Sequence, residues 1–168
     1  SRSYISQLLY KELALKLELS GEKPLREEGI LAKLYPSLNP IINELFFCNN
    51  LILVEGIEDV AYISTYLMLT GNNAEFRRLG CHIVPMGGKS SIVKPLAMAK
   101  LLNIPVFVVF DADTNKDRPD EIEKQKKDNR IILNLLGYTS ESEWPTATII
   151  KPDLYLWKTN LTAAIEAE

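Results

Sequence analysis

The stretch Leu51-Ile52-Leu53-Val54-Glu55-Gly56-Ile57-Glu58-Asp59 joins a short apolar run to a cluster of acids, and Val106-Phe107-Val108-Val109-Phe110-Asp111-Ala112-Asp113 repeats that arrangement later in the chain. Apolar runs of this kind are typical of strands that are buried on both faces, as in a parallel sheet. In open α/β sheets, ligands bind beyond the carboxyl ends of the strands. The two acidic clusters are therefore expected to meet at one edge of a parallel sheet.

Carboxylates brought together in this way repel one another, so they need a proton or a cation between them. Hard oxygen ligands suit Mg²⁺ or Mn²⁺. Each cluster also has a plainer interpretation. The pair Glu55 and Asp59 can cap a helix whose dipole favours acids, and Asp111 with Asp113 can close a strand in an Asx-turn. The two clusters together, in this order and after two strands, favour a metal site.

Composition sets wide limits on the class of protein. The chain has 168 residues, of which 46% are apolar and 24% charged, so we expect one domain with a core and a short appendage. The net charge of −3 gives no overall basic field for nucleic acid, although a local patch or a bound metal can still handle phosphates. Cys48 and Cys81 lack metal-site spacing and indicate reduced thiols of a cytoplasmic protein. No apolar run approaches the length of a membrane span, so no membrane association is expected.

Strand and helix patterns alternate along most of the chain. They predict an α/β fold with a central, mostly parallel sheet of about four strands flanked by helices. A helical appendage and linker are expected over residues 1–44 and the main domain over residues 45–168. Both ends suggest a piece of a longer protein. The predicted strands cover residues 51–54, 81–85, 105–110 and 147–150, and the predicted helices cover residues 3–19, 38–47, 58–70, 90–102 and 119–136, with a last one from about 160.

A Glu55-Gly56-x-x-Asp59 motif follows one strand, and an Asp111-x-Asp113 motif follows a later strand. Together, the two motifs resemble those of a Toprim domain. Toprim domains are the metal-binding modules of topoisomerases, primases, recombination-mediator proteins and OLD-family nucleases. Further details resemble the OLD (overcoming lysogenization defect) family of ATP-dependent endonucleases. These are the lead-in 45–56, the turn 84–89 and the loop 111–116. The resemblance covers about residues 45–135 and implies a Toprim/Rossmann-like sheet.

The resemblance also implies an activity, namely cleavage of DNA phosphodiester bonds with two Mg²⁺ or Mn²⁺ ions. Glu55, Asp59, Asp111 and Asp113 would hold the metals, and Glu55 would bind metal or act as a general acid or base. Ser64 matches a hydroxyl that helps the metal shell in some OLD nucleases. The family's extra acid for the second metal falls near Thr162, with Glu166 or Glu168 as the substitute.

The family further implies partners outside this sequence. A member would carry an N-terminal ATPase domain that binds ATP, would act on DNA in phage defence or DNA processing, and would be a possible homodimer. Its transition-state lysine is expected beyond residue 168. Within the chain, Lys89 and Lys116 are candidates for phosphate contacts, whereas the Gly87-Gly88-Lys89-Ser90 run lacks the Walker spacing because position 83 is Ile83.

Two alternatives stay open. One is another Toprim chemistry, namely that of a topoisomerase, primase or ribonuclease. A topoisomerase needs a nucleophilic tyrosine in a separate domain and a primase needs a zinc module, and these residues contain neither. The other is a non-catalytic Toprim domain that binds DNA, metal or a partner chain.

Overall fold

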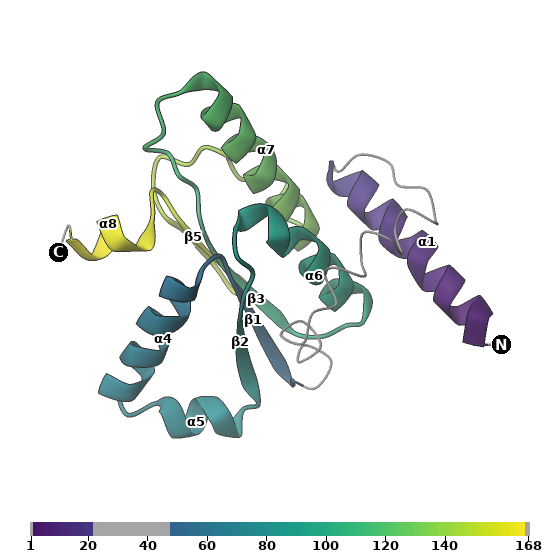
Figure 1. Ribbon diagram of the computed structural model, residues 1–168, viewed down its shortest axis with the longest axis horizontal. Helices are drawn as coiled ribbons and strands as arrows, with labels where there is room; N and C mark the ends of the chain where they lie inside the picture. The colour runs from purple at the N-terminus through teal and green to yellow at the C-terminus, as the bar shows by residue number, and fades with distance from the viewer. Residues whose placement is uncertain (1, 22–47, 167–168) are drawn as a thin grey trace.

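The computed structural model describes residues 2–21 and 48–166, with the side chains of residues 11–21 and 48–163. The predicted helix 38–47 and most of the predicted linker lie outside the described residues. Within them, the chain forms one sheet with helices on both of its faces (Figure 1), which confirms the predicted α/β class. Among the described helices, none has the length and apolarity needed to cross a membrane.

The sheet has five strands in the order β2-β1-β3-β5-β4. They are β1 (Asn50–Val54), β2 (Cys81–Pro85), β3 (Val106–Asp111), β4 (Ile149–Lys151) and β5 (Leu154–Trp157). β1 is parallel to β2 and β3, and β3 is parallel to β5, whereas β4 is antiparallel to β5. The carboxyl ends of β1, β2, β3 and β5 consequently lie at the same edge of the sheet.

The predicted strand 147–150 is present as β4, but the sheet has one strand more than the four predicted. The additional strand is β5, the neighbour of β3, whose Leu154 and Leu156 are fully buried. The short strand before it folds back as an antiparallel edge strand, and its Ile150 is 64% exposed. Pro152 and Asp153 form the two-residue turn between the strands, since Pro cannot donate to a ladder and both residues favour turns.

The helices begin and end close to their predicted positions, with one exception. The missed helix is α5 (Asn73–Arg78), which follows α4 after a short turn where the Gly71-Asn72-Asn73 run predicted a loop. Its Arg78 forms an exposed ion pair with Glu75 one turn earlier. The remaining helices are α1 (Arg2–Ser20), α4 (Ile57–Leu69), α6 (Lys89–Leu101), α7 (Pro119–Leu136) and α8 (Leu161–Glu166).

One face of the sheet carries the main core. Alternate residues of the strands point toward α6 and α7, and α1 packs on the outer side of these two helices (Figure 1). Leu13 and Leu17 of α1 are only 3% and 2% exposed, so this helix shares the core of the sheet. The core side chains on the strands are Leu51, Leu53, Val84, Val106, Val108, Phe110, Leu154 and Leu156.

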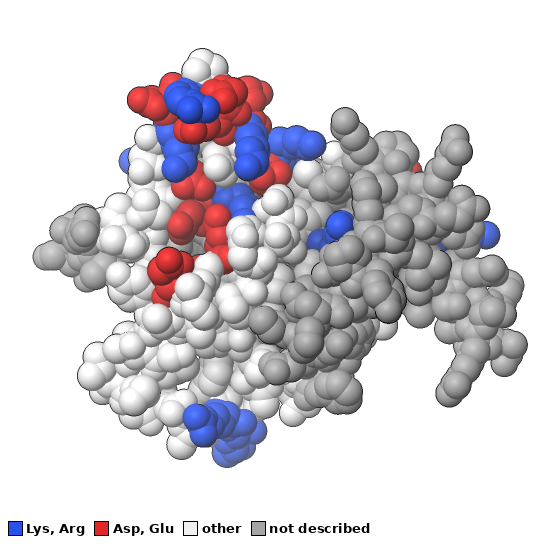
Figure 2. Space-filling model, viewed as in Figure 1, with Lys and Arg blue, Asp and Glu red and all other residues white. Residues whose placement is uncertain are grey.

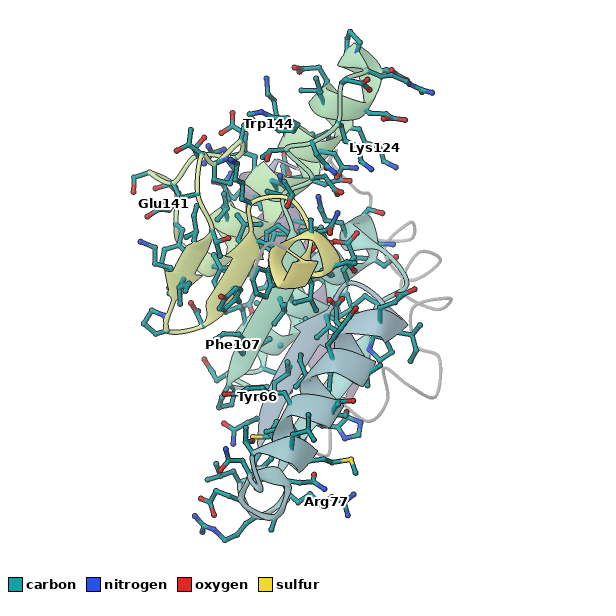
Figure 3. The ribbon with its side chains drawn as sticks, turned by 90° about the vertical axis from the view of Figure 1, so that its left-hand side faces the viewer. Tyr66, Arg77, Phe107, Lys124, Glu141 and Trp144 are labelled. Carbon is teal, nitrogen blue, oxygen red and sulfur yellow. The ribbon has the colours of Figure 1, made fainter. Side chains whose placement is uncertain are left out.

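The other face of the sheet is covered mainly by α4. Between α4 and the strands lies an apolar groove of about 740 Å³, whose lining includes Tyr62 and Tyr66 from the helix and Phe107, Tyr155 and Trp157 from the strands. Figure 3 shows Tyr66 and Phe107 on this side of the molecule. Tyr66 is 66% exposed, so this face remains partly open to solvent in the described structure.

Candidate functional site

Parallel pairing brings the two acidic clusters to one edge of the sheet. Val54 of β1 pairs with Val109 of β3, so Glu55 and Asp111 leave the two strands at nearly the same level. Both line a pocket of about 710 Å³ together with Asp59 at the start of α4. Figure 2 shows acidic side chains gathered in a hollow that extends from α7 toward the start of α4, with basic side chains beside it. The sequence prediction that the clusters meet is therefore confirmed for these three residues.

Glu55 connects the two clusters directly. Its Oε2 accepts a hydrogen bond from the backbone N–H of Asp111 at 3.3 Å, and its backbone carbonyl accepts one from Gly88 at the start of α6 at 2.9 Å. Burial raises the pKa of the Glu55 carboxyl, and the carboxylates of Asp113 and Asp59 raise it further, against the lowering effect of the Lys89 ammonium. This side chain is thus held between two strands and a helix.

Asp59 is 8% exposed and lies in the first turn of α4. Its Oδ2 accepts a hydrogen bond from the Gly56 N–H at 2.8 Å, so it caps the helix as the plainer interpretation of this motif predicts. Capping uses one carboxylate oxygen, and the side chain still lines the pocket. Burial raises the pKa of Asp59, and the neighbouring Glu58 carboxylate adds to that effect.

Asp111 is the most perturbed of the acids. Its Oδ1 is buried and has no hydrogen-bond partner in the structure. Burial, followed by the charges of Glu55, Asp59 and Asp113, raises its pKa to about 7. Like charges this close favour a shared proton or a bound cation.

Asp113 does not line this pocket. Its backbone leaves the extended conformation, with φ 57°, and its N–H donates to the Thr159 carbonyl at 3.0 Å. Its Oδ2 accepts a hydrogen bond from the Lys89 ammonium at 2.9 Å, and Lys116 lies 3.7 Å from its Oδ1. An extended Asp111-x-Asp113 segment would direct both carboxylates to one side, but the backbone at Asp113 is left-handed instead.

Residues 46–113 match the family model described as "Overcoming lysogenization defect protein-like, TOPRIM domain". This segment is an OLD-like Toprim domain. The match begins just before β1 and ends at Asp113, so it contains both acidic clusters. No curated protein matches the chain.

The Toprim domain meets part of the requirement for a divalent ion. Glu55, Asp59 and Asp111 supply hard oxygen donors, and the buried, unpartnered Oδ1 of Asp111 is a polar atom that a cation would satisfy. Among the described residues, no three His, Cys, Asp or Glu side chains are close enough to form a complete metal cage. The donor chemistry fits Mg²⁺ or Mn²⁺, while the side chains are not arranged as a finished coordination shell.

The other residues suggested by the sequence have different places in the structure. Ser64 is half-buried on α4 and is not among the residues that line the pocket. Thr162 of α8 does line it, whereas the side chain of Glu166 lies outside the described residues. Lys89 is buried and bound to Asp113, so it does not reach the pocket as a phosphate contact. Lys116 keeps 39% of its side chain exposed and remains a candidate for that role.

Sequence reasoning missed two polar residues that shape the site. Asn160 lines the pocket, and its Oδ1 accepts a hydrogen bond from the Ala163 N–H at 2.7 Å, as an N-cap does. The predicted start of the last helix at about residue 160 agrees with this cap, but it did not indicate that Asn160 lines the pocket. Asn129 is fully buried on α7 and donates to the Ala112 carbonyl at 3.1 Å. No local pattern marks that long-range contact.

Proposed function

We propose that this Toprim domain hydrolyses phosphodiester bonds of DNA with the help of a divalent metal ion held near Glu55, Asp59 and Asp111. The observation that carries the proposal is the buried, unpartnered Oδ1 of Asp111 in a pocket that two further carboxylates line. A nuclease-type or metal-binding module is what an OLD-like Toprim domain suggests. When bound, Mg²⁺ or Mn²⁺ supplies Lewis-acid stabilisation of phosphate charge and a nucleophilic water.

Side chains of this protein would have the other roles in the proposed reaction. Asp111 and Asp59 supply anionic oxygen atoms from β3 and α4, and their backbone positions are fixed by the parallel pairing and by the helix cap. Glu55 is held against the Asp111 backbone, and its raised pKa suits a group that exchanges a proton with water or a leaving oxygen. Lys116, whose side chain is 39% exposed and lies 3.7 Å from Asp113, would contact a phosphate of the DNA backbone.

The larger assembly belongs to the same proposal. Coupling to ATP through an ATPase domain in the parent protein, action as a homodimer and a role in phage defence follow from the OLD-like family and not from any contact in the described residues. They extend the proposal beyond the Toprim domain itself.

A nicking assay on supercoiled plasmid DNA tests the proposed activity. We expect the protein to nick DNA with Mg²⁺ or Mn²⁺ and to lose that activity in EDTA. Asp111→Asn should lower the rate by about 10²-fold or more, because a preorganised charge at the reacting centre is worth that much. Glu123→Gln is the matched control, since this carboxylate is 76% exposed on α7 and its loss should leave the rate unchanged. Equal rates for wild type and Asp111→Asn would refute the assignment.

A second candidate is a Toprim domain that binds metal or DNA without cleaving it. The observation in its favour is that no three described acids form a complete cage. DNA binding measured by fluorescence anisotropy separates the two functions. Metal-dependent DNA binding without any nicked product would support the binding module, whereas nicking that Asp111→Asn abolishes would exclude it.

A further inference from the structure

The side chain of Lys89 carries a positive charge into the interior next to the acidic site. Lys89 is the first residue of α6, and its side chain is only 3% exposed. Its Nζ donates to Asp113 Oδ2 at 2.9 Å and to Gln125 Oε1 at 2.6 Å, and it lies 5.9 Å from the ring centroid of Phe110. The loop after β3, helix α7 and the core side chain of Phe110 thus enclose the ammonium group of Lys89.

A buried ammonium is tolerated only when it is paired, and breaking such a pair leaves an uncompensated charge. Asp113 is the partner, and its own side chain is 15% exposed. Lys116 adds a second ammonium 3.7 Å from the other oxygen of the same carboxylate. The charge of Asp113 is therefore already balanced within the chain. A divalent cation bound to Asp113 would have to displace the ammonium of Lys89 or lie beside the two positively charged ammonium groups of Lys89 and Lys116.

Gly88 and Lys89 together join the two acidic clusters. The Gly88 N–H donates to the Glu55 carbonyl, and the side chain of Lys89 then reaches Asp113. The N-terminus of α6 therefore holds the ends of β1 and β3 in register at the pocket. Asn129 of α7 also supports the loop by donating to the carbonyl of Ala112.

We propose that the Lys89 ammonium, bound to Asp113, serves as an internal cation that limits this site to one divalent ion, with Asp113 acting as its anchor and not as a metal ligand. The proposal rests on the metal binding proposed above and makes it more specific. It departs from the two-ion site that the family resemblance implies. Lys89 is then a positioning residue, because it acts through the loop that presents Asp111.

The number of bound ions tests this directly. Electron paramagnetic resonance of free Mn²⁺ during a titration counts the ions that the protein takes up. We expect one ion per chain for the wild type. Asp113→Asn should keep one ion with an affinity within about threefold, since Asn tolerates the left-handed backbone at this position. Asp111→Asn, the same chemical change two residues earlier, should weaken binding by at least about tenfold.

Removing the Lys89 ammonium should change the number of Mn²⁺ ions that the protein binds. Lys89→Met leaves Asp113 without its buried partner, so this variant should bind a second Mn²⁺ ion, and Lys89→Arg should restore a count of one. A merely structural role for Lys89 would not alter the stoichiometry. If Lys89→Met fails to fold by circular dichroism, the Asp113→Asn titration decides the question alone.

The outcomes separate this inference from the proposed function. Two ions on the wild type, one of which Asp113→Asn removes, would overturn the internal-cation proposal and leave the metal-dependent function standing. A single ion on both wild type and well-folded Lys89→Met would overturn the claim that Lys89 sets the count. No uptake of Mn²⁺ by the wild type at about 1 mM would overturn the proposed function and this inference with it.

Discussion

Replacement of Asp111 by Asn should stabilise the protein in the absence of metal. The Asp111 carboxyl is buried among Glu55, Asp59 and Asp113, and its pKa is raised from 3.8 to about 7. The folded state consequently holds this proton more tightly than the unfolded chain does. Between pH 3.8 and about pH 7 the free energy of unfolding therefore falls as the pH rises, and above that range the full penalty applies.

The size of the effect follows from the shift. One pKa unit corresponds to about 1.36 kcal/mol, so the ionised Asp111 costs the folded state on the order of 4 kcal/mol at pH 8. The Asn amide must also be buried without a hydrogen-bond partner at one atom, which costs about 1–3 kcal/mol. We expect a net gain of about 2 kcal/mol, or a rise in Tm of about 4–8 °C for a chain of this size.

Thermal unfolding followed by circular dichroism measures this difference. In EDTA, the Tm of Asp111→Asn should exceed that of the wild type at about pH 8, and the gap should shrink as the pH falls toward about 5. Mg²⁺ at 100 times the wild-type Kd should stabilise the wild type by about 2.7 kcal/mol and Asp111→Asn by less, and so narrow or reverse the gap.

Asp113→Asn is the matched control, because the same chemical change there should lower the Tm by removing the partner of the buried Lys89 ammonium. A variant Asp111→Asn that is less stable than the wild type at pH 8 in EDTA would refute the argument. A difference that does not change between pH 5 and pH 8 would refute it equally.

Two further predictions concern the loops that hold the site. Asn129→Ala removes the buried Nδ2 that donates to the carbonyls of Ala112 and Glu143, so it should lower the free energy of unfolding in urea by roughly 2–3 kcal/mol; a loss below about 0.5 kcal/mol would contradict this account. Gly80→Ala places a methyl group 2.6 Å from a neighbouring side-chain nitrogen at φ +65°, whereas Gly71→Ala at φ +73° meets no atom within 4 Å. Gly80→Ala should therefore destabilise the protein more, by about 1 kcal/mol in the same assay, and equal losses would contradict the packing argument.

The strands nearest the site were predictable because the local run of apolar residues indicates that they are buried. Leu51–Val54 and Val106–Phe110 are continuous apolar runs, and a strand buried on both faces needs such a run. Because these two strands pair in parallel, the carboxylates that directly follow them lie at the same edge of the sheet. The third parallel neighbour was missed, because Leu154–Trp157 is short and follows the strand Ile149–Lys151 after a turn of only two residues.

The roles of the individual acids were less predictable, since they depend on contacts between distant residues. The sequence treats Asp111 and Asp113 as equivalent, yet a left-handed backbone at the second and a lysine from another helix give them different surroundings. The partners of Lys89 lie 24 and 36 residues away along the chain. No spacing rule connects such positions, so only the folded structure pairs them.

The position of Trp157 gives the protein an optical probe of its own site. Trp157 pairs with Asp111 across β5 and β3, its carbonyl accepts the Ala112 N–H, and its ring lies 4.3 Å from that of Tyr155 in the apolar groove. The chain has one other tryptophan, Trp144, whose ring lies beneath Lys126 on α7. Replacing Trp144 with Phe leaves a single tryptophan, which can be excited selectively over tyrosine, in the strand next to the acidic pocket. Its emission spectrum then reports on binding events at that pocket without any attached dye.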